Sequence, residues 1–508
     1  MSSKSIDFNS VLIGANMLVL GLLLFALATT DGNRFVNQET VALGILLCLQ
    51  THAALWVERR QRDPFVILLA FTTIFYFSLR VYTLTLYEFS HVFDRYFYDA
   101  ADSNYALIFI LIANLFLYFG LYLVKIKGRQ EVDAAGWQAA SSTRIVLLLV
   151  AAIFFAYFSG SSDPDTDPNS SRLLGFLSLF LAPNIIVLMA LSYFLLFRKT
   201  LSRRFALTIA TLIAIEMIVH TLVGSRSAIV VIVQNSIFVG LAMAGRIRFP
   251  RKYLVLGVVL LPVLAGLLVA SFAISTYNRA VRLAGGAFDV GRVLDSAKQS
   301  GSGLSLAESL DLVLPQVFNR AGFFDYSAEI IAHRNQYRSV INLPAYGRSI
   351  VDNVLTPGFD VYDQPKISNS LLFVYRDWGQ PSKEVVSVVE GYQSDQLGVY
   401  GEWYSLFGYG CLPVLFAGAY LLKRVYVHLR SANPFVLMMK RVVVLFVFER
   451  MLDSFGLDWT IEETIPLVFA IFVYAYFFSI KRIKDADSLL QMRPDGKPLI
   501  TDVPTATG

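Results

Sequence analysis

The sequence predicts an all-α polytopic membrane protein with about 12 transmembrane helices and one large, mostly helical external loop. Hydrophobic residues make up 56% of the 508 residues, charged residues only 16%, and the mean hydropathy is +0.57. A soluble globular protein has roughly 25% charged residues. Long apolar runs recur along the chain, and a polar stretch at 277–402 interrupts them. This composition excludes a soluble enzyme, a disordered chain and a nucleic-acid-binding domain.

Each predicted transmembrane helix is an apolar run near the length that crosses a bilayer, which is about 20 residues. The first group lies in residues 1–276 and the second in residues 403–484, followed by a polar tail at 485–508. The runs cover residues 11–30, 41–57, 65–87, 105–124, 145–160, 173–197, 205–223, 227–245, 253–276, 403–422, 434–448 and 464–480. The sequence therefore predicts a transmembrane domain in two parts, joined by residues 277–402.

Basic residues predict the orientation, because they gather in every second connection. The basic connections hold Arg59, Arg60 and Arg62; Lys125, Lys127, Arg129 and Arg144; Arg198, Lys199, Arg203 and Arg204; Arg246, Arg248, Arg251 and Lys252; and Lys423, Arg424 and Arg430. The opposite short connections hold one arginine each: Arg34, Arg95, Arg172, Arg226 and Arg450. The positive-inside rule places the basic set, both termini and the tail in the cytoplasm. Residues 26–28 also fit a signal-peptide cleavage site, but an uncleaved first helix is the simpler interpretation.

The 277–402 loop is then external, and long translocated loops are exempt from the charge rule. Residues 305–308 form a possible capping box that opens a helical stretch, and Pro315 should interrupt that stretch. Helical spacing returns at 316–333. Because a structureless loop of this length is unusual, we expect a folded cap over the outer membrane face. A plain spacer is the alternative.

Several charged residues lie within the predicted spans, where they face a bundle interior or an aqueous cavity. Arg80 lies in the span 65–87. Glu216 and His220, four residues apart, share one face of the span 205–223. Acidic residues crowd the last outer connection: Glu449, Asp453, Asp458, Glu462 and Glu463.

Arginines also gather on the predicted outer side, at positions 226, 279, 320 and 450. Arginine binds phosphate oxygens bidentately and keeps its charge. The shared outward side predicts an anionic ligand at the outer face. A contact with a lipid headgroup, or an ion pair with a nearby acid, is the alternative for each arginine.

Several segments together resemble the Wzy-type O-antigen and exopolysaccharide repeat-unit polymerases over about residues 205 to 480. Five features occur in the family's order. They are a glycine-serine-arginine turn, an arginine that opens the large loop, an arginine-plus-acid helix, a glutamate-to-glycine entry into the next span and a late glutamate-arginine pair. They are Gly224-Ser225-Arg226-Ser227-Ala228, Tyr277-Asn278-Arg279, Arg320 to Asp325, Gly401 to Gly410, and Glu449-Arg450, with weaker similarity at Asn342-Leu343-Pro344 and Asp363 to Lys366. The first 200 residues carry only the span pattern, and Arg80 has no assigned counterpart.

The resemblance implies a membrane glycosyltransferase of the polymerase-ligase branch of the GT-C type. Its substrate would be an oligosaccharide repeat unit on undecaprenyl pyrophosphate, in the bilayer of a bacterial inner membrane. The reaction would move the growing glycan from one lipid carrier onto the sugar of the next, at the periplasmic side. No cofactor and no metal are implied, and a flippase and a chain-length regulator of the same pathway would be partners.

The chemistry of that reaction assigns roles to the residues. Breaking a glycosyl–pyrophosphate bond leaves an anion, which arginines can stabilise. The predicted pyrophosphate- and substrate-binding residues are Arg226, with Gly224 and Ser225 in its turn, Arg279, Arg320, Arg450 and Arg80. A general base for the acceptor hydroxyl is useful, and the candidates are Glu402, His333 and Asp325, with Glu216 further back. Glu402 ranks first because it lies where the loop re-enters the membrane, although a helix cap or an ion pair would also explain it.

Three other functions stay open. The first is a lipid-A-core ligase, a class whose pattern has a histidine-asparagine pair late in the outer loop. In this chain His333-Arg334-Asn335 lies early in the loop and has an intervening arginine. The second is a sugar transferase whose long first outer loop carries the catalytic acids, but the first outer loop of this chain, residues 31–39, is too short for such a domain. A flippase or other transporter of lipid-linked oligosaccharide would place charges along a lumen and would repeat its halves.

Overall fold

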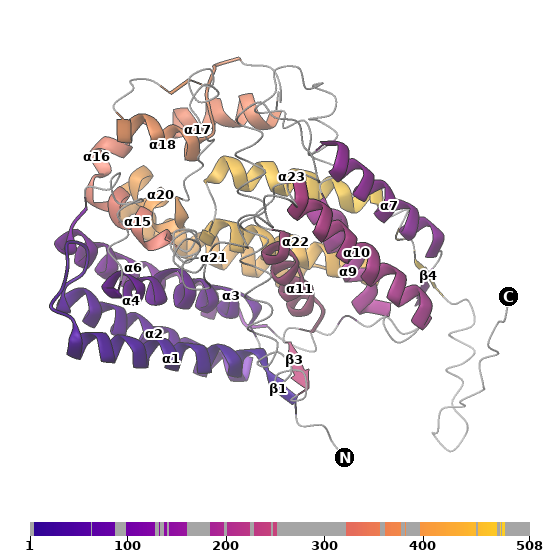
Figure 1. Cartoon of the computed structure of the whole chain (residues 1–508), viewed down its shortest axis with the longest axis horizontal. Coiled ribbons are helices and arrows are strands. Elements are labelled where there is room, and N and C mark those ends of the chain that lie inside the picture. Colours follow the sequence, from indigo (N-terminus) through magenta and orange to yellow (C-terminus); the bar gives the residue numbers. More distant parts are fainter. Residues whose placement is uncertain are drawn as a thin grey trace, which may run out of the picture.

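The computed structural model of the chain is predominantly helical (Figure 1). It describes residues 5–61, 63–86, 98–126, 132, 137–139, 142–159, 183–197, 201–223, 228–244, 247–250, 322–355, 361–376, 381–382, 397–453, 456–474, 478 and 480–482. All statements about structure below concern these residues.

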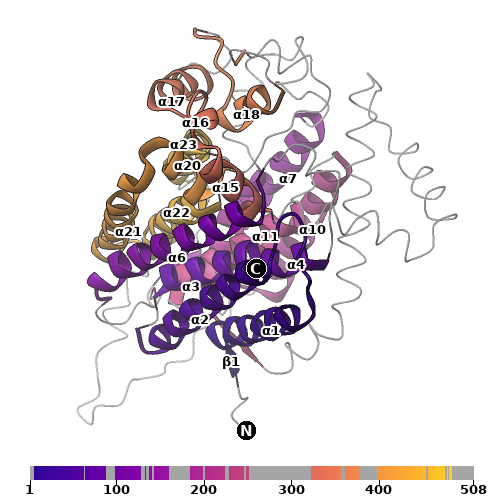
Figure 2. The ribbon, with the colours of Figure 1, turned by 90° about the vertical axis from the view of Figure 1, so that its left-hand side faces the viewer.

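The N-terminal helices lie side by side and form one half of the bundle (Figures 1 and 2). They are α1 Phe8–Thr29, α2 Gln38–Gln61, α3 Pro64–Thr72, the π-helix η1 Thr73–Ser78, α4 Leu79–Leu86 and α6 Ala100–Leu123. Acidic caps fix their starts, because an aspartate side chain accepts a free amide of the first turn. Asp7 caps α1, Asp63 caps α3 ahead of Pro64, and Asp99 forms a capping box with Asp102 at α6.

The remaining bundle helices pack beside this half. They are α7 Ser142–Ser159, α9 Pro183–Phe197, α10 Arg203–Val223, α11 Ala228–Ala244, α20 Gly398–Phe407, the 3₁₀ turn η3 Gly408–Gly410, α21 Cys411–His428, α22 Pro434–Asp453 and α23 Leu457–Tyr474. Helix α21 packs along α6, and α22 packs against α11, α3 and α9. At Gly120 the backbones of α6 and α21 come so close that a Cβ would lie 2.5 Å from the Phe416 carbonyl oxygen. Small residues permit such close packing of membrane helices.

Five helical stretches of the described chain are long and apolar enough to cross a membrane, which confirms the membrane class. They are Phe8–Thr29, Gln38–Glu58, Pro64–Leu86, Ala100–Leu123 and Gly398–His428. Predicted spans 145–160, 205–223, 227–245 and 434–448 coincide with helices α7, α10, α11 and α22. Helix α9 covers part of 173–197, α23 begins before 464–480, and span 253–276 lies outside the described residues. The count of twelve stays a prediction.

Four short strands join the chain ends to internal connections. β1 Ser5–Asp7 pairs antiparallel with β3 Arg248–Pro250, and β2 Trp137–Ala139 pairs antiparallel with β4 Ile480–Arg482. All four strands lie in segments that the charge distribution assigns to the cytoplasmic side. Their pairing is consistent with that assignment, because paired segments must share one side of the membrane.

Short helices from the predicted external loop cover one end of the bundle (Figure 2). They are α15 Phe323–Ala332, α16 Arg334–Tyr337, α17 Leu343–Ile350, the π-helix η2 Val351–Leu355 and α18 Ile367–Arg376. Helix α15 packs on α20 and α6, and α17 packs on α23. At Gly401 of α20 a Cβ would lie 3.3 Å from the Cα of Ser327, so glycine lets α15 approach closely. The described part of the loop is thus a folded helical cap.

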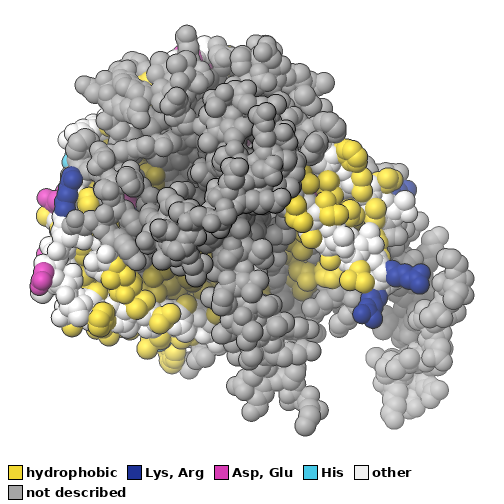
Figure 3. Space-filling model, in the orientation of Figure 1, with side chains coloured by type: hydrophobic (Ala, Val, Ile, Leu, Met, Phe, Trp, Pro, Cys, Tyr) yellow, Lys and Arg dark blue, Asp and Glu magenta, His cyan; other side chains and the backbone are white. Residues whose placement is uncertain are grey.

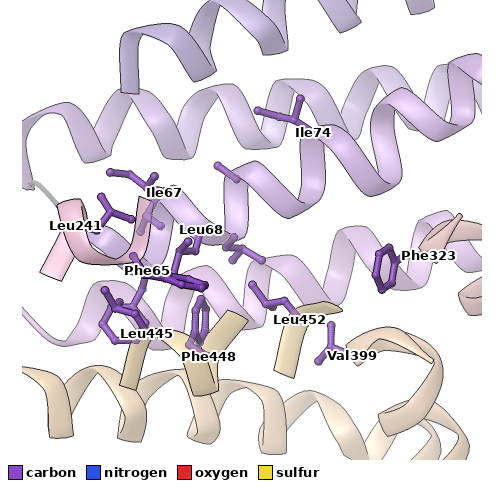
Figure 4. Close-up of a cluster of buried hydrophobic side chains, with 14 of the residues drawn as sticks. Phe65, Ile67, Leu68, Ile74, Leu241, Phe323, Val399, Leu445, Phe448 and Leu452 are labelled. Carbon is purple, nitrogen blue, oxygen red and sulfur yellow. The ribbon is translucent and has the colours of Figure 1, made fainter. Parts of the chain in front are cut away.

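The buried core lies where the two halves of the bundle meet (Figure 4). Phe65 of α3 contacts the Phe448 ring of α22, with the ring centroids 5.0 Å apart. Leu452 and the loop residue Phe323 continue this cluster toward α15. Outside the core, apolar side chains cover the face over α1 and α2 and the face over α7 and α10 (Figure 3). Extended exposed apolar surfaces of this kind suit contact with lipid.

Candidate active site

A buried ion pair joins the third predicted span to the external loop. Arg80 lies on α4, directly after the π-helix η1, and Asp325 lies in the first turn of α15; each is 1% exposed. The Arg80 Nε and a terminal guanidinium nitrogen each lie 2.8 Å from Asp325 Oδ2. The Tyr98 hydroxyl donates to Asp325 Oδ1 over 2.9 Å. Both carboxylate oxygens are therefore bonded, which offsets the cost of burying the charges.

A second carboxylate, Glu329, extends this group one turn along α15. Its Oε2 accepts the Tyr98 main-chain amide over 2.9 Å, and its Oε1 accepts the Tyr337 hydroxyl over 3.0 Å. Burial, with the charge of Asp325 second, raises the pKa of Tyr98 well above its ordinary value, so Tyr98 stays a donor. His333 lies at the edge, its Nδ1 3.7 Å from Glu329 Oε1. We call Arg80, Asp325, Tyr98 and Glu329 the Arg80 cluster.

Glu402 lies inside α20 and is only 2% exposed. Its Oε1 accepts the Tyr346 hydroxyl over 2.5 Å and the Leu457 amide over 2.8 Å. Leu457 is the first residue of α23, so Glu402 caps the positive end of that helix. Burial, followed by the charge of Glu402, raises the pKa of Tyr346 well above its ordinary value. The predicted base Glu402 thus serves here as a cap that joins α17, α20 and α23.

Asp458, the next residue of α23, attaches two loop helices to the bundle. Its Oδ2 accepts the Ser349 hydroxyl over 2.6 Å and the Ile367 amide over 2.9 Å. Burial raises the pKa of Asp458, and these hydrogen bonds oppose that rise. Lys366 adds an ion pair to Glu462 of α23 over 2.8 Å. The loop is therefore bound to α23 by buried carboxylates rather than by apolar packing alone.

Arg450 lies at the end of α22 among three carboxylates. Its Nε is 2.7 Å from an oxygen of Glu463, and its guanidinium is 3.9 Å from both Glu449 and Asp453. Gln234 of α11 donates to Glu449 Oε1. The group holds more negative than positive formal charge, so Arg450 is already neutralised in this structure. We call Arg450, Glu449, Asp453 and Glu463 the Arg450 cluster.

Tyr76 of η1 lies between the two clusters. It interacts electrostatically with Asp453 and Glu449. Its ring lies 4.5 Å from the ring of Phe323, two residues before Asp325. The Tyr76–Phe323 contact thus has the predicted residues Arg80 and Asp325 on one side and Arg450 on the other. π-helical turns such as η1 are frequent at functional sites.

The other predicted ligand residues lie outside the described residues: Gly224, Ser225, Arg226, Arg279 and Arg320. Helix α11 begins at Ala228, directly after the glycine-serine-arginine segment. Glu216 of α10 is 2% exposed, and neither of its carboxylate oxygens has a hydrogen-bond partner. The His220 side chain is outside the described part, so the proposed contact between these two residues stays a prediction.

Metal-independence also stays a prediction. Among the described residues, no three His, Cys, Asp or Glu side chains are arranged to hold a metal ion. Asp163, Asp165 and Asp167 alternate in the predicted outer connection before 173–197, outside the described ranges. Alternating carboxylates are oxygen ligands of the kind that divalent cations prefer. The metal requirement is therefore a matter for experiment.

Comparison with known proteins gives no match: no family model fits the chain, and no curated protein or solved structure is significantly similar to it.

Proposed function

We propose that the chain is a metal-independent membrane glycosyltransferase that polymerises oligosaccharide repeat units carried on undecaprenyl pyrophosphate. The proposed site is the outer face of a bacterial cytoplasmic membrane. One observation carries the proposal: two clusters of arginine and carboxylate lie on either side of Tyr76, one where loop helix α15 meets α4 and the other at the end of α22. The motif resemblance supplies the substrate class, and the membrane-spanning helices supply the setting.

Arg450 suits the leaving group better than Arg80 does. Its side chain is 17% exposed, and its closest acid, Glu463, is 31% exposed. A pyrophosphate oxygen can take the place of such an exposed carboxylate, because arginine binds both anions with the same planar fork. Arg80 is fully buried against Asp325, so it positions α15 instead of touching substrate. The remaining charge on the pyrophosphate falls to Arg226, Arg279 and Arg320, as the resemblance implies.

The predicted bases differ in their availability. Both oxygens of Asp325 are bonded to buried donors, and Glu402 caps α23. His333 is 24% exposed on its side chain and adjoins Glu329. Among these three predicted bases, His333 therefore has the most exposed side chain.

Glycan profiling of a deletion strain tests the proposal. Loss of the gene should leave single-repeat products, and the wild-type chain should restore the polymer ladder. Arg226→Lys should lower polymer yield by roughly thirty- to a thousandfold, because lysine lacks the fork that holds two oxygens. Glu58→Gln is a control for a change of charge outside the two clusters, since Glu58 is a buried carboxylate on α2, bonded to Asn9.

Protein abundance in the membrane is measured on the same samples. Full polymer from Arg226→Lys would make Arg226 an interface anchor. Intact polymer that stays on its lipid carrier in the deletion strain would indicate a ligase. Transport of labelled substrate across vesicles without chain growth would indicate a flippase.

A further inference from the structure

Two carboxyl groups of the Arg450 cluster have unbonded oxygens despite deep burial. Glu449 and Asp453 lie four residues apart on one face of α22, and they are 6% and 7% exposed. Glu449 Oε2 and Asp453 Oδ1 accept no hydrogen bond, and each lies 3.9 Å from the Arg450 guanidinium. Asp325 and Asp458, by contrast, accept donors on both oxygens. A buried carboxylate oxygen without a donor is costly, so its retention calls for a function.

The pair also lies near a membrane-spanning helix. Its electrostatic neighbour Tyr76 is near the middle of the Pro64–Leu86 span. Ionisable groups buried against such helices mark substrate or proton pathways in membrane proteins. The charged groups that face the pair are Arg450 and Glu463. Two adjacent buried carboxyl groups do not both ionise readily, because each negative charge disfavours the other.

We propose that the Glu449–Asp453 pair is the proton acceptor of the glycosyl transfer, an inference that rests on the proposed function. The acceptor sugar hydroxyl gives its proton to Glu449 Oε2 while its oxygen bonds to the anomeric carbon of the donor. The bond from that carbon to the pyrophosphate oxygen breaks, and its electron pair leaves on the pyrophosphate. Arg450, between the pair and the more exposed Glu463, is placed to stabilise that anion.

The surroundings orient the pair for this step. Gln234 donates to Glu449 Oε1, which leaves Oε2 for the substrate. Gln234 lies in the second turn of α11, which begins directly after the segment that carries Arg226. Chain connectivity therefore links the proposed base to the predicted pyrophosphate-binding turn through one helix.

The test uses the full chain in phospholipid vesicles, with lipid-pyrophosphate-linked repeat units isolated from the deletion strain. The initial rates of polymer growth and of lipid pyrophosphate release are measured against substrate concentration. Glu449→Gln and Asp453→Asn should each lower kcat by about 10²- to 10⁴-fold, because general base catalysis contributes that much. KM should stay within about threefold of wild type, since ground-state binding is unchanged. Glu58→Gln should retain the wild-type rate.

Formate separates catalysis from folding. In Glu449→Ala, this small carboxylate should restore part of the rate, because it can occupy the space of the missing side chain and accept the proton. Rates within about threefold of wild type in both Glu449→Gln and Asp453→Asn would overturn the inference. A loss that formate does not reverse would assign the pair a structural role and would also overturn it. A wild-type chain that makes no polymer from this substrate would instead refute the proposed function.

Discussion

Removing Asp325 should release the loop helix α15 from the bundle. Asp325→Leu removes the two contacts at 2.8 Å that Asp325 makes with Arg80, which is only 1% exposed. Breaking one side of a buried ion pair costs about 3–5 kcal/mol. Local opening of α15 should therefore become roughly 10²- to 10⁴-fold more frequent, because each 1.36 kcal/mol is a factor of ten.

Hydrogen exchange of the α15 amides, Phe323–Ala332, measures this opening on the full chain in detergent. The amides of α10 are an internal control, because α10 packs on α7, α9 and α11. The double variant Arg80→Met/Asp325→Leu removes both charges and should return the exchange of α15 toward the wild-type rate. Wild-type exchange in Asp325→Leu, or a double variant that exchanges faster than either single one, would refute this reasoning.

Three further outcomes are expected. Polymer growth in vesicles should continue in EDTA, and a loss that magnesium or manganese restores would give Asp163, Asp165 and Asp167 a role. Gly120→Leu should disrupt the packing of α6 on α21 and lower the thermal unfolding midpoint, because the Cβ would lie 2.5 Å from a backbone oxygen. An unchanged midpoint would contradict this packing. Lys366→Met should destabilise the attachment of the loop by only about 1 kcal/mol, because the partly exposed ion pair with Glu462 is modest. Proteolysis of the loop should therefore become about fivefold faster, and a rise of well over tenfold would contradict that figure.

Helix existence could be predicted from apolar runs, but helix starts depend on polar caps. The predicted span 65–87 matches Pro64–Leu86, because the apolar run begins directly after the cap Asp63. The predicted span 105–124 begins five residues late. The first turn of α6 is polar, and the Asp99 capping box starts the helix at Ala100. Similarly, Glu402 was expected at the loop boundary but lies within a helix that begins at Gly398.

Contacts between distant segments could not be read from the sequence. Arg80 could be predicted as a buried charge, but its partner Asp325 is 245 residues away. Tyr98 and Tyr346 carry no local signal, because a tyrosine in a loop or a short helix is unremarkable until its partner is known. The carboxyl pair had a weak signal, since Glu449 and Asp453 have the spacing of one helix face. Their unbonded oxygens become visible only in three dimensions.

The most direct test of the central claim is the reaction of the purified chain with its proposed substrate alone. Vesicles that contain the full chain receive lipid-pyrophosphate-linked repeat units, and the products are separated by length. We predict a ladder of multiples of the repeat unit, with one lipid pyrophosphate released for each new glycosidic bond. Unchanged single repeat units in the presence of folded protein would contradict the account.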